Sequence, residues 1–375
     1  MYPFSYDHAY GALAGAAVGD AAGATLEFYR KGRITSNIAK HAMTMPGGGS
    51  LHVAPGQITD DTELALALSS SLIKFNPTRG YPADSVAESY IKWYKSNPFD
   101  MGNTTAKAFS IQDFANPFQT ISQIMIENSN QENINSEANG SLMRITPVSI
   151  WCSRNNSITT EQIANIARQD ALLSHPSDVC QDCNAIYCIA QSYLIKHPLD
   201  ADGAINIVEE YLNTNIISGT VSDWVLKDSK LSYLEIAKNV TKNIGWVRHG
   251  FTLAFHFLRN KLEYEEAIMK TLMCGGDTDT NACIVGGLMG ALWGEPKIPL
   301  YMKLPVLTLD SNKIEIKDDV MNAVFNSIYK KKNMYDDVGY NRPSVYSTFD
   351  LYKIVNGLLG LDINFNNGIG CACTC

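Results

Sequence analysis

The sequence GGDTDTNACIVGGLMGALW occupies residues 275–293 and joins a short acidic cluster to a long run of small and apolar residues. Asp277 and Asp279 are each followed by a threonine at the start of this run. The pattern predicts a helix that begins at the cluster, since acidic side chains are favoured at the positive end of a helix dipole. An EF-hand loop is excluded, because its sixth and twelfth positions would be Ala282 and Leu288 instead of glycine and glutamate.

A second acidic cluster lies far upstream, in the sequence GQITDDTELALAL at residues 56–68. Asp60 and Asp61 stand between two threonines there and precede leucines that recur every four positions. This spacing predicts a helix with one apolar face. Taken alone, the cluster is explained by helix capping, with Thr59 or Asp60 as the capping residue.

The two clusters together suggest a second interpretation. If they meet in the folded chain, four carboxylates crowd one pocket, and like charges at short range oppose folding unless a cation neutralises them. Carboxylate and hydroxyl oxygens suit Mg²⁺, Mn²⁺ or Ca²⁺ and not zinc or copper. Two divalent cations would balance the four charges. Capping and a dinuclear metal site therefore stay open as alternatives from the residues alone.

The rest of the chain is dominated by helical periodicity, which predicts a compact, single-domain, all-α fold of many helices. Glycines at positions 11, 15, 19 and 23 form a stripe that would let another helix approach closely. The Asn-rich stretch at residues 128–140 is predicted to be a mobile loop. We expect the main domain to span residues 1–299, followed by a helical appendage with a flexible, Cys-containing tail at residues 300–375.

Composition sets further limits. The chain has 375 residues, of which 45% are hydrophobic, and a net charge of −8 without any run rich in Lys or Arg, so direct nucleic-acid binding is not expected. Neither a secretory signal nor a stretch apolar enough to span a membrane is visible, which predicts a cytoplasmic protein without membrane partners. Nine cysteines, an odd number, argue against a disulfide framework. Zinc at Cys180 and Cys183 is a weak alternative, because no second CxxC pair exists.

The chain resembles the ADP-ribosylglycohydrolase family, and is most similar to the bacterial ADP-ribosyl-[dinitrogen reductase] glycohydrolase-like branch. The resemblance covers roughly residues 8–295 through separated motifs in the order of the family, which read GALAGAAVGDAAGATLEF, GGGSLHVAPGQITDDTELALAL, FDMGNTTAKAF, ANGSLMRITPV, LSHPSDVC and CGGDTDTNACIVGGLMGALWG. It implies an all-α fold with two Mg²⁺ or Mn²⁺ ions. The residues that match the ligand positions of the family are Thr59, Asp60, Asp61, Asp277, Asp279 and Thr280.

The resemblance also implies roles for residues outside the two clusters. Glu27 matches a glutamate on a flexible loop over the metals, and Glu27, Asp60 and Asp279 are the implied catalytic acids. The other implied substrate-binding positions are a phosphate-binding turn, a histidine, an aromatic residue for the adenine and an acidic loop that faces the group attached to the ribose. They correspond to Asn139, Gly140, Ser141, Met143 and Arg144, to His175, to Trp246, and to Asp100 with Gly102.

The activity implied by the resemblance is hydrolysis of the bond between ADP-ribose and an acceptor, with protein arginine as the leading acceptor. The partner would be an ADP-ribosylated protein, and ADP-ribose the product. Three alternatives use the same chemistry on a serine, nucleobase or O-acetyl linkage. A further alternative from another class is a non-catalytic ADP-ribose reader, which loss of an acidic residue would favour, and none is lost here.

Overall fold

The computed structural model describes residues 2–29, 32–111, 118–312, 315–316 and 339–361. Within these residues the chain is built almost entirely of helices, and the strands are limited to the two-residue pair β1 (Leu309–Asp310) and β2 (Glu315–Ile316). This pair is antiparallel, with Leu309 opposite Ile316. The prediction of an all-α fold is confirmed.

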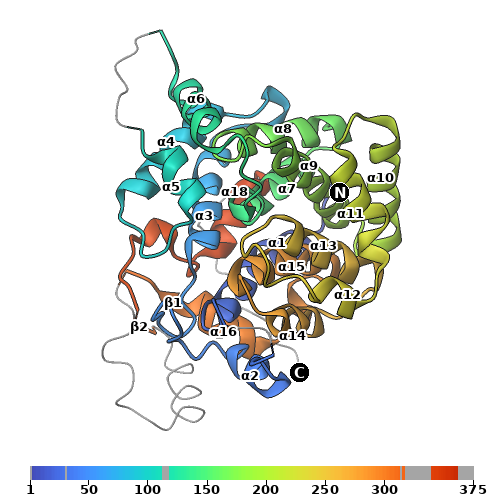
Figure 1. Cartoon of the computed structure of the whole chain (residues 1–375). Helices are drawn as coiled ribbons and strands as arrows, with labels where there is room; N and C mark the ends of the chain where they lie inside the picture. Colours follow the sequence, from blue (N-terminus) through green and yellow to red (C-terminus); the bar gives the residue numbers. More distant parts are fainter. Residues whose placement is uncertain (1, 30–31, 112–117, 313–314, 317–338, 362–375) are drawn as a thin grey trace.

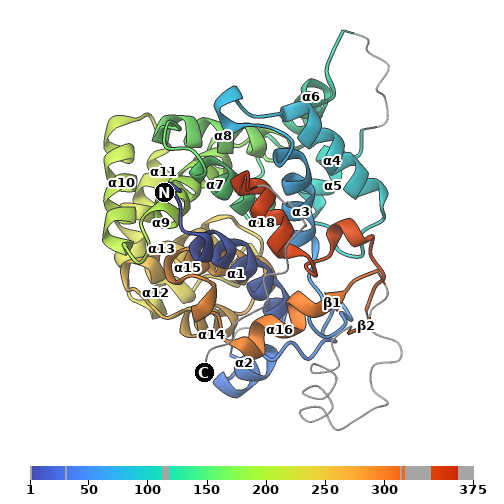
Figure 2. The ribbon, with the colours of Figure 1, turned by 180° about the vertical axis from the view of Figure 1, so that it is seen from behind.

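Two helices that pack against each other form the centre of the molecule (Figures 1 and 2). They are α1 (Tyr6–Ala24) and α15 (Thr278–Trp293), and nearly every residue of each is buried. They run antiparallel, since Gly11 lies against Gly290 and Gly23 against Asp279. A Cβ atom on Gly19 would overlap the carbonyl group of Ala282, so only glycine allows the two backbones to come this close.

Helices around this pair complete the core. Their bounds are α3 (Asp60–Leu72), α7 (Thr146–Ser153), α9 (Asp178–Lys196), α13 (Arg248–Arg259), α14 (Tyr264–Cys274) and α16 (Leu300–Thr308). An outer set comprises α2 (Ser36–Ala42), α4 (Ala83–Lys95), α5 (Asn103–Phe109), α6 (Ile121–Asn133), α8 (Thr160–Leu172), α10 (Ala201–Thr214), α11 (Gly219–Leu226), α12 (Tyr233–Ala237) and α18 (Leu351–Leu359). Short 3-10 turns are η1 (Pro77–Arg79), η2 (Asn139–Ser141), η3 (Asp228–Lys230), η4 (Glu295–Lys297) and η5 (Ser344–Tyr346).

The prediction of a mobile loop at residues 128–140 is wrong for its first part, because residues 128–133 belong to α6. A capping box of Thr120 and Gln123 starts this helix. The side-chain amide of Asn133 then donates hydrogen bonds to the carbonyl groups of Thr104 and Ser174. Tertiary hydrogen bonds thus overrode the polar composition on which the prediction rested.

The C-terminal part of the chain is described up to residue 361, and α18 packs on α7, α3 and α1. The predicted Cys-containing tail lies outside the described residues. Nothing tests the division of the chain at residue 299, which stays a prediction.

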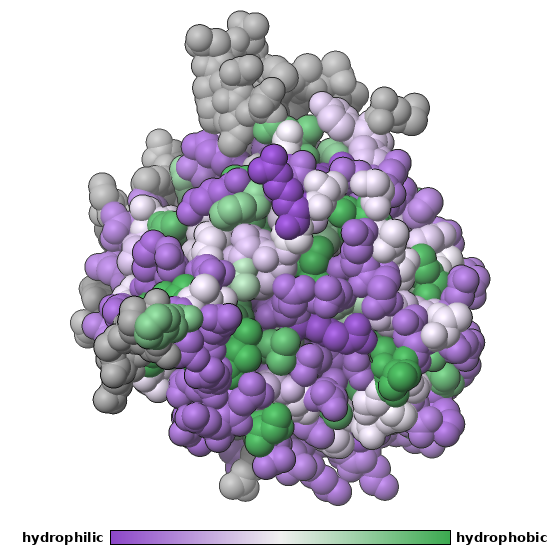
Figure 3. All heavy atoms as spheres, turned by 90° about the horizontal axis from the view of Figure 1, so that it is seen from above, coloured by the Kyte–Doolittle hydropathy of each residue, from purple (hydrophilic) through white to green (hydrophobic). Residues whose placement is uncertain are grey.

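The surface is mainly hydrophilic on the face shown in Figure 3, with small, separate apolar patches. Among the described helices, none is long and apolar enough to cross a membrane.

Candidate functional site

The candidate site lies where α1 ends and α15 begins. Because these helices are antiparallel, the turn after α1 brings Glu27 next to Asp277 and Asp279 at the start of α15. The hydroxyl group of Thr278 donates a 2.8 Å hydrogen bond to the carbonyl group of Gly23, which fixes the two helix ends together.

The first turn of α3 is attached to the same place by Asp20, which is completely buried on α1. The carboxylate of Asp20 accepts hydrogen bonds from the backbone N–H and the hydroxyl group of both Thr59 and Thr62, at 2.6–3.1 Å. Thr59 is the residue before α3, but its side chain makes no capping hydrogen bond. The hydroxyl group of Thr59 also lies 2.9 Å from Oδ2 of Asp61. The threonines of this cluster therefore serve the site more than the helix terminus.

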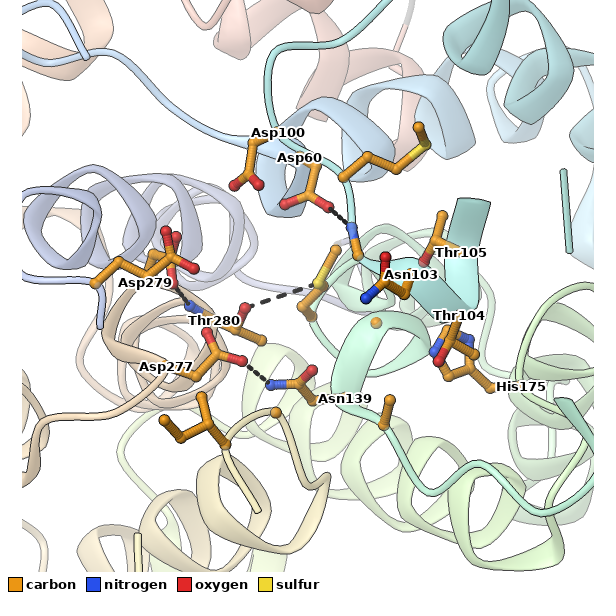
Figure 4. Close-up of a pocket in the computed structure, with 18 of the residues that line it drawn as sticks. Asp60, Asp100, Asn103, Thr104, Thr105, Asn139, His175, Asp277, Asp279 and Thr280 are labelled. Atoms are coloured by element: carbon orange, nitrogen blue, oxygen red, sulfur yellow. Dashed lines mark hydrogen bonds between the residues drawn. The ribbon is translucent and has the colours of Figure 1, made fainter. Parts of the chain in front are cut away.

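A cavity of about 340 Å³ opens at this junction (Figure 4). The acidic residues Asp60, Asp277 and Asp279 lie on one side of it, and His175 lies on the other. The predicted site residues that line it are Glu27, Asp60, Asp100, Gly102, Asn139, Gly140, Met143, His175, Asp277, Asp279 and Thr280. The structure thus brings both acidic clusters to one cavity.

Carboxylate oxygens crowd the acidic side. One oxygen each of Glu27, Asp100 and Asp279 lies within 4.8 Å of the other two. Asp61 lies behind the cavity wall, fully buried, with Oδ2 at 3.5 Å from the hydroxyl group of Thr280. One further contact joins the walls, since the backbone N–H of Gly102 donates to Oδ2 of Asp60 at 3.2 Å.

Burial and mutual repulsion make these carboxyl groups hard to ionise. Burial, with the charge of Asp100 adding to it, raises the pKa of Glu27 to about 9. Burial together with the charge of Asp277 raises the pKa of Asp100 to about 6. The pKa values of Asp60, Asp61 and Asp279 are also raised, first by burial and then by neighbouring acids. Neutralisation of this side therefore requires protons or bound cations.

The donor set of the acidic side fits divalent cations. Within the described part of the chain, Oε2 of Glu27 and Oδ1 of Asp61 are buried without a hydrogen-bond partner, which is costly for a carboxylate oxygen unless it is protonated or coordinated. The buried arginines Arg144 and Arg342 do not neutralise it, because they pair with Asp170 and Glu63. The ligand types are carboxylates and hydroxyls, the set that Mg²⁺ and Mn²⁺ prefer.

The opposite side of the cavity is polar but uncharged. Asn139 begins η2 and donates from its side-chain amide to Oδ2 of Asp277 at 2.8 Å. Gly140 lies so close to the His175 ring that a Cβ atom would approach it to 2.9 Å. Burial, aided by the charge of Arg144, lowers the pKa of His175 to about 3. His175 is therefore neutral at physiological pH, and its Nε2 has no hydrogen-bond partner among the residues that the structure describes.

Five residues of the predicted site do not line this cavity, namely Thr59 and Asp61, described above, and Ser141, Arg144 and Trp246. Ser141 is buried and accepts a hydrogen bond from Asn184. Arg144 is fully buried in an ion pair with Asp170, at 3.1 Å, and stacks on Tyr90. Trp246 lies in a neighbouring hollow of about 360 Å³, where its indole N–H donates to Glu137.

The sequence reasoning missed Asp20. The signal was present, because Asp20 is the one charged residue in a long stretch of small and apolar residues that is predicted to be buried. Asn103, Thr104 and Thr105 also line the cavity and were not singled out.

Comparisons with known proteins agree on one family. The family model described as ADP-ribosylglycohydrolase matches residues 1–332. A protein of Acanthamoeba polyphaga mimivirus, named as ADP-ribosyl glycohydrolase L543, is 32% identical over 80% of this chain and 89% of its own length. ADP-ribosyl-[dinitrogen reductase] glycohydrolase of Rhodospirillum rubrum is 28% identical over 79% of this chain and 89% of its own. ADP-ribosylarginine hydrolase Tri1 of Pseudomonas putida is 25% identical over 78% and 72%.

The fold has a counterpart among solved structures. A chain titled "ADP-ribosylglycohydrolase-related protein complex" superposes with a TM-score of 0.62 and covers 79% of this chain and 91% of that one. Its sequence identity of 22% supports a likeness of fold alone.

Proposed function

The chain belongs to the ADP-ribosylglycohydrolase family, and on that premise we propose that it releases ADP-ribose from modified arginine side chains of proteins. Hydrolysis of a glycosyl bond is the activity of the family. The preference for arginine is supported by the relative named ADP-ribosylarginine hydrolase and by the acidic side chains in the cavity. Free ADP-ribose is the product, and the cytoplasm is the predicted compartment.

One observation carries the proposal, namely the convergence of the ends of α1, α3 and α15 on a single cavity. The acidic residues found there are far apart in the sequence and are costly to bury together. A merely structural helix cap would not need them to meet. Retention of every acid favours an enzyme over a non-catalytic reader.

The proposal includes two divalent cations, Mg²⁺ or Mn²⁺. They would be held by Thr59, Asp60, Asp61, Asp277, Asp279 and Thr280. When bound, such cations act as Lewis acids and orient the vicinal hydroxyl groups of the ribose and the attacking water.

In the proposed hydrolysis, carboxylate groups of the chain take part in proton transfer. Water adds through its oxygen to the anomeric carbon while the bond to the acceptor nitrogen breaks, through a transition state with oxocarbenium character. Asp60 or Asp279 accepts the proton of the water, and the leaving guanidine group takes up one proton in return. Glu27 faces the same cavity and assists by positioning or proton transfer. Its loop is held in place by the N–H of Phe28, which donates to the carbonyl group of Gly276 at 3.2 Å.

The uncharged side of the cavity suits the diphosphate. The turn at Asn139 and Gly140 allows close backbone approach without a net positive charge. The hydroxyl group of Ser174 lies 2.8 Å from Nδ1 of His175. When this hydroxyl group donates to Nδ1, the ring proton is on Nε2, and the Nε2–H group can donate a hydrogen bond to a phosphate oxygen.

The proposal is tested by a panel of arginine-, serine- and nucleobase-linked ADP-ribose with measurement of free ADP-ribose by chromatography. We expect the highest kcat/KM on ADP-ribosyl-arginine. Tight binding of ADP-ribose without turnover on any conjugate would identify a reader. Turnover confined to another linkage would change the acceptor but keep the chemistry.

The variant Asp100→Asn tests whether Asp100 binds the arginine acceptor or the divalent cations. We expect kcat/KM for ADP-ribosyl-arginine to fall by about 10–100-fold, since a charge-assisted hydrogen bond contributes about 1.5–3 kcal/mol. The value for ADP-ribosyl-serine, which has no guanidinium group, should change far less. An equal loss on both conjugates would mean that Asp100 serves the cations and not the arginine.

A further inference from the structure

A segment near the C-terminus lies against the loops that lead into the site. The backbone N–H of Gly339 donates to the carbonyl group of His52 at 2.7 Å. Tyr340 exchanges two hydrogen bonds with the side chain of Gln57, and its ring stacks on Phe99 at 4.3 Å with an angle of 5° between the planes. These residues follow the 1–332 range matched by the family model.

Arg342 is the centre of this contact. Its side chain is 4% exposed and forms a two-pronged ion pair with Glu63, with N–O distances of 2.8 and 2.9 Å. The remaining donors reach the carbonyl groups of Ser96 and Asn97 and the hydroxyl group of Ser96. The planar guanidinium group is suited to this task, since lysine cannot make such a fork.

The partners of Arg342 belong to two segments, one that carries Asp60 and one that carries Asp100. Glu63 lies in the first turn of α3, two residues after Asp61. Ser96 and Asn97 begin the loop that leads to Asp100. Glu63 also accepts a hydrogen bond from the indole of Trp93 at 2.8 Å. Both oxygens of its carboxylate therefore have partners, and Glu63 does not line the cavity. The buried guanidinium group of Arg342 thus connects the start of α3 with the loop that leads to Asp100.

We propose that Arg342 is a positioning residue, which holds Asp60, Asp61 and Asp100 in register from outside the family-matched part of the chain. The side chain does not line the cavity, so it acts through Glu63 and the loop at residues 96–100. Loss of the guanidinium group leaves the buried Glu63 charge unpaired and frees both segments. The role in catalysis rests on the proposed hydrolysis, and the role in cation binding rests on the proposed divalent cations.

The test compares Arg342→Gln and Arg342→Lys with the full-length wild type. Mn²⁺ affinity is measured by calorimetry without substrate, and kcat, KM and melting temperature are measured separately. We expect Arg342→Gln to weaken Mn²⁺ binding by about 10–100-fold, the range for residues that orient metal ligands, and Arg342→Lys to fall in between. The double variant with Glu63→Gln and Arg342→Gln should weaken Mn²⁺ binding no more than Arg342→Gln alone, because the ion pair between the two residues is already lost in the single variant.

Arg259→Gln is the matched control. Arg259 also uses several donors, to Glu209, Ser229 and Val225, but none of them belongs to the site. It should lower the melting temperature and leave Mn²⁺ affinity within about twofold. A lowered melting temperature with wild-type Mn²⁺ affinity in both Arg342 variants would overturn the proposal. Failure of the wild type to release ADP-ribose would count against the proposed hydrolysis and leave the binding test intact, whereas failure of the wild type to bind Mn²⁺ would overturn the role of Arg342 in cation binding.

Discussion

Asp279→Asn is expected to reduce kcat on ADP-ribosyl-arginine by about 10³-fold, within the range for loss of a catalytic acid or base. Asparagine keeps the size of the side chain and an oxygen that can accept the N–H of Thr280, as Oδ1 of Asp279 does at 2.9 Å. It loses the negative charge, which serves both as a cation ligand and as a proton acceptor. Initial rates of ADP-ribose release at saturating Mn²⁺ measure the effect.

Asp182→Asn provides the control for Asp279→Asn. Asp182 is also a buried acid near a helix start, but it pairs with Arg168 and is not among the cavity-lining residues. We expect its kcat to stay within about threefold of the wild type, with the loss confined to stability. If Asp279→Asn retained more than about a tenth of the wild-type rate, the acidic cluster would not carry the chemistry.

The sequence predicted that each acidic cluster starts a helix but not the way in which the two clusters meet. Thr59 and the acids after it predicted a helix start, and α3 begins at Asp60. The sequence did not predict that the hydroxyl groups of Thr59 and Thr62 would donate to Asp20, because this contact depends on how deeply α1 lies in the core. The meeting of Asp61 with Thr280 depends on the antiparallel packing of α1 and α15. The glycine stripe of α1 predicted a close partner helix without identifying it.

Two arginines show why the remainder needed three dimensions. Arg144 was expected at the phosphate-binding turn because of its place in a motif. The pairing with Asp170 could not be read from spacing, since Arg144 lies in the turn before α7 and Asp170 lies in α8. Arg342 lies within the polar stretch at residues 329–344, whose composition is typical of a solvated connector. Its burial against Glu63 joins residues 279 positions apart.

Removal of divalent cations should stop ADP-ribose release and make the stability of the protein strongly dependent on pH. In EDTA we expect the melting temperature to fall as the pH rises from about 5 to about 8. Burial raises the pKa of Asp100 to about 6 and that of Asp20 to about 7, above the values of the unfolded chain. The folded form therefore holds these protons more tightly, which stabilises it below the unfolded pKa values and is lost as the pH passes the folded ones. Differential scanning calorimetry across this range measures the trend.

Mn²⁺ should reverse that trend, since it replaces the protons as the neutralising charge. At about 100 times its Kd, a ligand that binds only the folded state adds about 2.7 kcal/mol to the free energy of unfolding. The gain should be larger at pH 8 than at pH 5, because fewer protons must then be displaced from the carboxylates. NaCl at the same ionic strength is the control, since screening alone should not restore activity. Full turnover in EDTA, or a melting temperature that rises with pH in its presence, would contradict a cation site built from these acids.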